Sequence, residues 1–86
     1  MAQWRRVHDA QGLGAAIAQL RRTHGLTQGE LSEWLGVDRS TVVRLEAGDV
    51  AQLRRLMDAL SVLGADLVVL ERTAHVTVTG EAGETS

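Results

Sequence analysis

Apolar positions recur every three or four residues over most of the chain, which is the spacing of one face of an α-helix. Leu13, Ala16 and Leu20 have this spacing in a stretch rich in alanine and leucine, and Gly25 follows it. Glycine takes the left-handed conformation that ends many helices at little steric cost. The pattern therefore predicts a first helix over residues 13–24.

Two shorter helices are predicted next, separated by a tight turn. Thr27 precedes Glu30 by three residues, which is the spacing of a capping box that satisfies two free amides at a helix start. This helix is predicted to run to Leu35 and to end at Gly36. The next helix is predicted to start after Asp38, whose carboxylate is expected to cap it and to contribute about 1 kcal/mol. The stretch thus predicts a helix-turn-helix.

The apolar residues of this helix-turn-helix are expected to face inward and to hold its second helix across the first. They are Leu31, Leu35, Val37, Val42 and Leu45. Trp34 lies between two of them in helical register. We expect it to pack at the edge of the core, with docking of a partner as the alternative.

The opposite face of the second helix is left free and polar. It carries two arginines and two small hydroxyl residues, Arg39, Ser40, Thr41 and Arg44. A helix of this composition suits the major groove, where arginine can bond O6 and N7 of guanine and hydroxyl groups can reach base edges or phosphates. Gln28, at the start of the preceding helix, can donate to a phosphate beside the backbone amides there.

The pattern then changes from helical to extended. An amphipathic helix is predicted up to Gly64, with Asp49 as its cap and with one apolar face formed by Leu53, Leu56, Met57, Leu60 and Leu63. A short strand buried on both faces is predicted for the apolar run Leu67, Val68, Val69 and Leu70. Alternation over residues 73–79 leaves a longer or second strand open, and residues 80–86 are expected to be disordered.

A single strand needs a partner for its backbone hydrogen bonds. Two partners are available: the N-terminal segment around Trp4 and Val7, and the same strand of a second chain about a dyad. The second arrangement would build a homodimer with a continuous small sheet. We favour dimerisation through residues 67–70, with the N-terminal segment as a flanking strand.

Composition excludes several classes of protein. The 86 residues fit one small domain, and the chain has no cysteine, which excludes disulfides and thiolate metal sites. No apolar run approaches the ~20 residues that span a bilayer, and no signal-peptide pattern is present, so we expect a cytoplasmic protein without a membrane partner. His8, His24 and His75 lack ligand spacing. We therefore expect no metal, no cofactor and no enzymatic activity.

Charge restricts how the chain could bind nucleic acid. The formal net charge is −2, the chain has no lysine, and residues 1–48 hold six arginines against five acidic residues, whereas residues 49–86 hold three against six. Bulk charge therefore does not favour binding to a polyanion. Binding to DNA must rest on a few placed arginines.

Residues 13–63 resemble the lambda-repressor/Cro-like (Xre-type) helix-turn-helix family. The resemblance rests on LTQ at 26–28, EL at 30–31, Gly36, RSTV at 39–42 and LEAG at 45–48. It implies that Gln28, Arg39, Ser40, Thr41 and Arg44 contact double-stranded DNA, an operator with two half-sites. It also implies a partly buried ion pair between Arg21 and Glu46. The chain departs from the family at Asp38, one of the predicted DNA-binding residues. Serine or threonine is common at this position, and the negative charge of an aspartate would repel phosphate.

A narrower resemblance is to HipB-like antitoxins, which add a dimerising strand to this helical domain, as ADLVVLER at 65–72 would do here. VHDAQGLGAAI at 7–17 is also similar to that group. The resemblance implies a repressor that controls its own operon and binds a HipA-like serine/threonine kinase toxin. A stand-alone Xre-type transcriptional regulator is the alternative.

The expected fold is mainly α: a four- to five-helix repressor-like helix-turn-helix domain whose short C-terminal β-strand pairs across a homodimer. Residues 1–12 are expected to form an N-terminal extension with a possible short strand. Residues 13–64 form the DNA-binding domain, residues 65–79 the dimerising strand region and residues 80–86 the tail. When bound to DNA, the protein would be associated with the nucleoid.

Overall fold

The computed structural model describes residues 4–72, and these residues form four helices and a two-stranded sheet. The elements follow in the order β1 (Trp4–Val7), α1 (Ala10–Thr23), α2 (Gln28–Leu35), α3 (Arg39–Ala47), α4 (Ala51–Val62) and β2 (Leu67–Leu70). The chain is mainly helical, as the sequence predicts. The extended segment expected over residues 73–79 and the tail expected over residues 80–86 lie outside the described residues.

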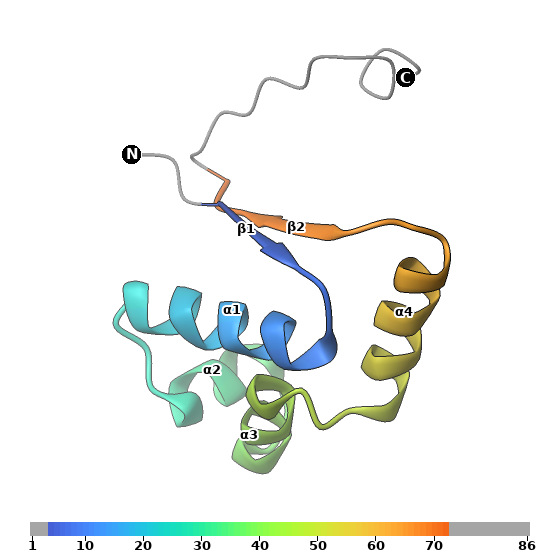
Figure 1. Cartoon of the computed structure of the whole chain (residues 1–86). Helices are drawn as coiled ribbons and strands as arrows, with labels where there is room; N and C mark the ends of the chain where they lie inside the picture. Colours follow the sequence, from blue (N-terminus) through green and yellow to red (C-terminus); the bar gives the residue numbers. More distant parts are fainter. Residues whose placement is uncertain (1–3, 73–86) are drawn as a thin grey trace.

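Helix α1 is the central element of the fold. Figure 1 shows the sheet on one side of α1 and helices α2 and α3 on the other. The buried residues of α1 are all small: Ala10, Gly14, Ala16 and Ala18. A Cβ atom at Gly14 would lie against the backbone carbonyl oxygens of Leu45 and Glu46. Gly14 therefore lets α3 approach the backbone of α1 closely.

The sheet joins the two ends of the described chain. Strands β1 and β2 are antiparallel, with Trp4 opposite Leu70 and Val7 opposite Leu67. The ladder partner of β2 is thus the N-terminal segment of the same chain, the first of the two predicted partners. Pairing of β2 with a second chain stays a prediction.

The expectation that β2 is buried on both faces is wrong. Leu67 and Val69 are half-buried on the side that faces the helices, whereas Val68 and Leu70 are exposed. The sheet lies on one side of α1, and within residues 4–72 no element covers its outer face. Only alternate residues of the strand are therefore removed from water.

The hydrophobic core lies between α1, α4 and the sheet. Its buried members are Val7, Ala10, Ala16 and Met57, with Leu13, Leu53, Leu60, Leu67 and Val69 packed around them. Two of the residues predicted for the apolar face of α4, Leu56 and Leu63, are exposed instead. Figure 1 shows α4 at the side of the molecule, so that neighbours cover it from one direction only.

The predicted signals at both ends of α2 are confirmed. The amide of Glu30 donates to Oγ1 of Thr27 at 3.1 Å, and the amide of Thr27 donates to Oε1 of Glu30 at 2.9 Å. Gly36 ends α2 with a left-handed φ of 70°. The short sequence from Thr27 to Gly36 thus specifies a short helix with two defined ends.

Helix α1 begins earlier than the sequence predicts, at Ala10 rather than at Leu13. The carboxylate of Asp9 accepts a hydrogen bond from the amide of Gly12 at 2.7 Å. An aspartate at this position satisfies one of the free amides of the first turn. This cap adds nearly one turn of helix before the apolar periodicity starts.

The Asp9 cap is not among the predicted ones, and the two aspartate caps that the sequence predicts, Asp38 and Asp49, do not form. Asp38 occupies the residue before α3, but its side chain makes no capping hydrogen bond. Helix α4 starts after Val50 rather than after Asp49. The carboxylate of Asp49 instead accepts a hydrogen bond from Nη1 of Arg54 at 3.2 Å, and an ion pair with an arginine replaces the cap.

Candidate nucleic-acid interface

Helices α2 and α3 form a helix-turn-helix whose turn satisfies its own backbone groups. The amides of Gly36 and Val37 donate to the carbonyl oxygens of Glu33 and Ser32 at 3.2 and 3.0 Å. Val42 of α3 is fully buried, with 0% of its surface exposed. The turn is therefore closed locally, and Val42 anchors α3 to the helices beneath it.

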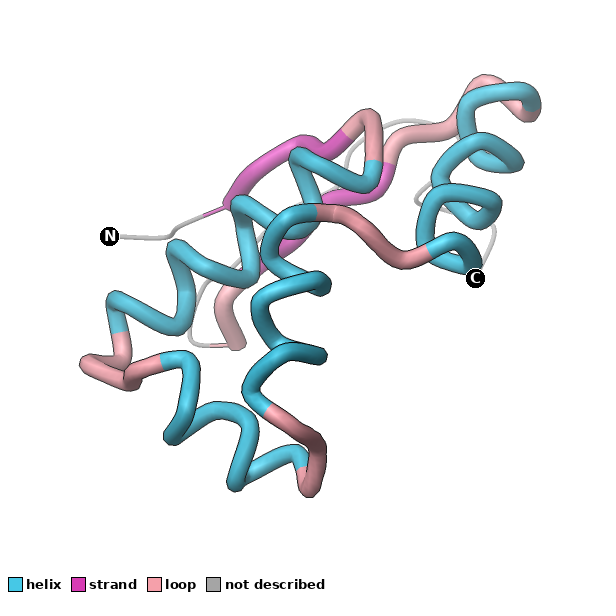
Figure 2. Tube along the Cα trace, turned by 90° about the horizontal axis from the view of Figure 1, so that it is seen from below, coloured by secondary structure: helices cyan, strands magenta, loops and turns pink. Residues whose placement is uncertain are grey.

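Three apolar residues predicted to pack inward are exposed instead. Leu35 is 53% exposed, Val37 is 39% exposed and Trp34 is 81% exposed. The prediction that Leu35 and Val37 face inward is therefore wrong, and so is the packing role predicted for Trp34. Figure 2 shows the loop between α2 and α3 at a corner of the molecule, away from α1 and the sheet. The apolar spacing predicts a buried face here, but no other described element lies close enough to this corner to cover these residues.

Arg21 and Glu46, the pair that the family resemblance joins, lie in contact at the centre of the helical region. Nε of Arg21 donates to Oε2 of Glu46 at 2.6 Å, and Nη2 donates to Oε1 at 3.1 Å. Nη1 of Arg21 donates to the carbonyl oxygen of Leu26 at 2.8 Å. One guanidinium thus links α1, the loop before α2, and α3 with bidentate geometry.

This contact also sets the charge state of Glu46. The hydrogen bond from Arg21 lowers the pKa of the Glu46 carboxyl below its ordinary value of 4.5, and the hydrogen bond from Gln28 lowers it further, while burial opposes both. The same pair raises the pKa of Arg21. Both groups are charged near neutral pH, so the ion pair holds α3 in place under physiological conditions.

The outward face of α3 brings most of the predicted DNA-binding residues together. Arg39, Ser40 and Arg44 are exposed on it, and Asp38 is exposed at its start, next to Arg39. Thr41 is half-buried, since it lies on the flank of α3 that turns toward the neighbouring helices. The exposed residues form a surface along one side of a helix of nine residues.

Two members of this face are not among the residues that the sequence predicts. Val43 is 42% exposed and Ala47 is exposed, although neither is polar. Their position could have been found from the helical period, because residues one and five positions after the buried Val42 point away from it.

Gln28 is placed differently from the other candidates. Its Nε2 donates to Oε1 of Glu46 at 3.1 Å, so its side chain is turned toward the ion pair. A primary amide carries two N–H groups. One of them is engaged by Glu46, and the other is the group that a phosphate would need.

Residues 12–73, more than two thirds of the chain, match the helix-turn-helix domain family. The chain belongs to this family. Membership suggests a DNA-binding regulator, and domains of this kind are typically not enzymes. No curated protein and no solved structure matches the chain significantly.

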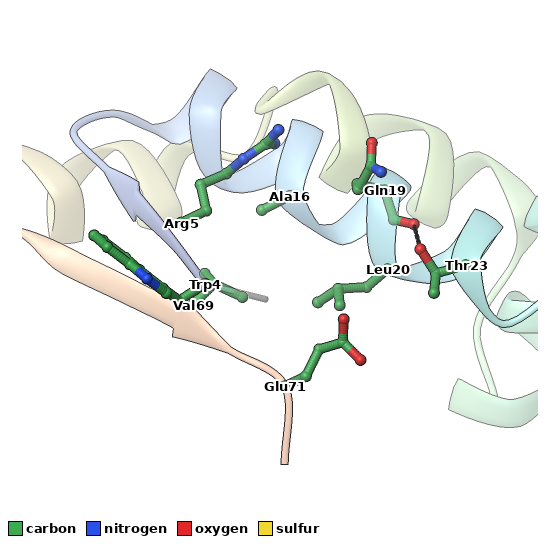
Figure 3. Close-up of a pocket in the computed structure, with 8 residues that line it drawn as sticks. All are labelled: Trp4, Arg5, Ala16, Gln19, Leu20, Thr23, Val69 and Glu71. Atoms are coloured by element: carbon green, nitrogen blue, oxygen red, sulfur yellow. Dashed lines mark hydrogen bonds between the residues drawn. The ribbon is translucent and has the colours of Figure 1, made fainter. Parts of the chain in front are cut away.

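The helix-turn-helix domain has a pocket of about 360 Å³ away from α3, between the sheet and α1. Figure 3 shows its lining, with Arg5 and Glu71 among apolar groups such as Ala16, Leu20 and Val69. Since the sheet and α3 lie on opposite sides of α1, this pocket is separate from the outward face of α3.

Two further features of the helix-turn-helix domain concern clusters of metal-ligand residues and the length of its helices. Within residues 4–72, no three histidine, aspartate or glutamate side chains are arranged to hold a metal ion. Every helix in the part of the chain that the structure describes is too short or too polar to cross a lipid bilayer.

Proposed function

We propose that this protein is a sequence-specific DNA-binding repressor of the lambda-repressor/Cro-like (Xre-type) kind. The observation that carries the proposal is the placement of α3. Val42 and Glu46 fix one side of α3 against the other helices, and the opposite side exposes Arg39 and Arg44. A helix held in this way can enter a major groove without rearrangement of the domain.

Each predicted DNA-binding residue has a proposed role in this complex. Arg39 and Arg44 donate to O6 and N7 of guanines, and Ser40 and Thr41 donate to base edges or phosphates. Gln28 keeps its hydrogen bond to Glu46 and donates its second N–H to a phosphate at the start of α2. Asp38 lies at the same end as Arg39, where its charge opposes phosphate and so restricts how α3 can be seated.

The base-reading role is tested with a duplex selected from a random-sequence library. We expect Arg44→Ala to weaken binding to this duplex by about 1–3 kcal/mol and to relax base preference at one position. Gln28→Ala should weaken binding to every sequence alike, because a phosphate contact carries no sequence information. Fluorescence anisotropy titrations on the selected duplex and its single-base variants measure both effects.

Arg54→Ala is the matched control, because Arg54 is exposed on α4 and is paired with Asp49. It should leave DNA binding unchanged. Small, equal losses on all sequences for Arg44→Ala would contradict its base-reading role.

We propose further that the repressor acts as a homodimer joined through residues 67–70. The sheet is two-stranded in the described residues, with β1 on one edge of β2 and no described strand on the other. An isolated two-stranded ribbon is marginally stable in water. Pairing of Leu67, Val68, Val69 and Leu70 with the same strand of a second copy would complete a four-stranded sheet and position two α3 helices for two half-sites.

The finer proposal is that this repressor is the antitoxin of a HipBA-like pair and binds a HipA-like serine/threonine kinase toxin. The feature that favours it is the sheet added to the helical domain, in line with the resemblance of residues 7–17 and 65–72 to HipB-like antitoxins. Affinity purification of the tagged protein from its native cells, with mass spectrometry, is the test. A near-stoichiometric kinase-like partner supports the antitoxin role, and a homodimer recovered alone supports a stand-alone regulator.

A further inference from the structure

The outward face of α3 has an apolar centre. Around the helix axis, successive residues are about 100° apart. The exposed residues therefore follow one another around the face in the order Arg39, Val43, Ala47, Ser40 and Arg44. The two arginines lie at its two edges, and a valine, an alanine and a serine lie between them.

Val43 is the largest side chain in the middle of this face. It is 42% exposed, whereas its neighbour Val42 is fully buried and supplies the packing of α3. Ala47 lies one turn further along the helix and Ser40 one turn before, and both are small. Val43 is therefore bordered by the small residues Ser40 and Ala47 and, one turn before it on the other side, by Arg39.

The major groove offers one apolar group, the C5 methyl of thymine. Arginines on both sides of Val43 complement the phosphates and guanines that surround such a methyl group in a groove. The free energy falls when an apolar side chain exposed to water is covered by another apolar surface. The charged edges argue that this surface belongs to DNA rather than to an apolar protein.

We propose that Val43 is a specificity-determining residue that contacts the methyl group of a thymine in each half-site. This inference rests on the proposed function, because it requires α3 to lie in the major groove. It adds an A·T preference at the centre of a helix whose edges carry guanine-binding arginines. Ser40 and Ala47 admit the methyl group because neither carries a bulky side chain.

The test removes the methyl group from DNA and the side chain from the protein separately. Uracil differs from thymine only in lacking the methyl group, so duplexes of the selected site are prepared with each thymine replaced in turn by uracil. For the wild-type protein, one thymine of each half-site should respond, with affinity falling roughly fourfold, the effect of one buried methyl-sized group. Val43→Ala should bind the thymine duplex more weakly and should no longer distinguish uracil from thymine.

Val43→Ile is the conservative variant and should retain the dependence on the methyl group. Since Val43 is exposed, both variants should melt at the wild-type temperature, which separates a loss of contact from a loss of folding. The inference is overturned if no uracil substitution affects the wild-type protein, or if Val43→Ala keeps the full wild-type response to uracil.

The outcomes also separate this inference from the proposed function. If the protein selects no sequence from the library, both fail. If it selects a site that Arg44→Ala no longer recognises, while uracil substitution changes nothing, DNA reading by α3 stands and the role of Val43 is overturned.

Discussion

At the scale of single residues, Glu46 couples the position of α3 to pH. Its carboxylate accepts hydrogen bonds from Arg21 and Gln28, and these contacts lower its pKa below 4.5. A carboxyl whose pKa is lower in the folded state stabilises that state fully above its unfolded pKa. The stabilisation is lost as pH falls through the lower, folded pKa.

We expect Glu46→Gln to lower the melting temperature at neutral pH, because a neutral amide forms a weaker contact with the Arg21 guanidinium. Below about pH 4.5 the difference from wild type should shrink progressively and should vanish once the pH lies below the lowered pKa of the folded carboxyl, where the wild-type carboxyl is protonated too. Thermal unfolding followed by circular dichroism between about pH 3 and pH 7 measures this. Glu33→Gln, at an exposed position of α2, is the control and should follow wild type throughout. A difference for Glu46→Gln that stayed constant with pH would contradict the account.

At the scale of elements, the crossing of α1 and α3 depends on one glycine. The Cβ of any other residue at position 14 would meet backbone carbonyl oxygens of Leu45 and Glu46. Backbone atoms inside a helix cannot rotate away as the end of a flexible side chain can. The two helices would have to separate, and α3 would lose its position relative to α2.

We therefore expect Gly14→Ala to reduce the free energy of unfolding by about 1–3 kcal/mol, the usual cost of an overpacked interior. Gly29→Ala is the matched control, because a Cβ there would meet only Oγ1 of Thr27, at 3.8 Å. Alanine is the better helix former, so this control should be neutral or stabilising. Urea unfolding of both variants measures these free energies of unfolding. Equal stability of the two variants would show that the crossing of α1 and α3 tolerates a side chain at position 14.

The elements also show what sequence can and cannot predict here. Helix α2 was predictable because Thr27, Glu30 and Gly36 act on the backbone within a few residues of themselves. The exposure of Trp34 was not, because it depends on where the corner between α2 and α3 lies relative to α1. Asp38 illustrates a second limit: its position before α3 follows from the backbone, but a capping bond also requires one particular side-chain rotamer.

The candidate site divides in the same way. Arg39, Ser40 and Arg44 were predictable as an exposed face because polar residues at helical spacing seldom pack inward. Val43 was missed because a residue was assigned to the face by its polarity, and Val43 is apolar at an outward position. The hydrogen bond from Gln28 to Glu46 joins residues 18 apart in sequence, and local patterns carry no signal for it.

At the scale of the whole molecule, the proposed repressor binds one operator as two copies. A single α3 of nine residues reads one half-site, and the chain's net charge of −2 gives little unspecific attraction to DNA. Two copies joined through β2 would present two α3 helices to half-sites about one helical turn, or roughly 34–36 Å, apart. Dimerisation and DNA affinity should therefore be lost together.

Val68→Asp should affect dimerisation without affecting folding, because Val68 is exposed on the outer face of the sheet. In the proposed dimer, strands paired about a dyad bring the two copies of this residue near each other, and like charges there disfavour pairing. We expect folded monomers that bind the operator far more weakly, as measured by sedimentation equilibrium and anisotropy. Val37→Asp, at the corner between α2 and α3, should remain dimeric. An unchanged mass for Val68→Asp would place the interface elsewhere.

Whether a dimer reads DNA sequence through α3 can be measured by selecting binding sites from a random-sequence duplex library with the wild-type protein. We expect an enriched, palindromic site whose half-site centres lie about 10 base pairs apart. Enrichment of no sequence would contradict sequence-specific binding. Enrichment of a single, unrepeated half-site would contradict the dimer.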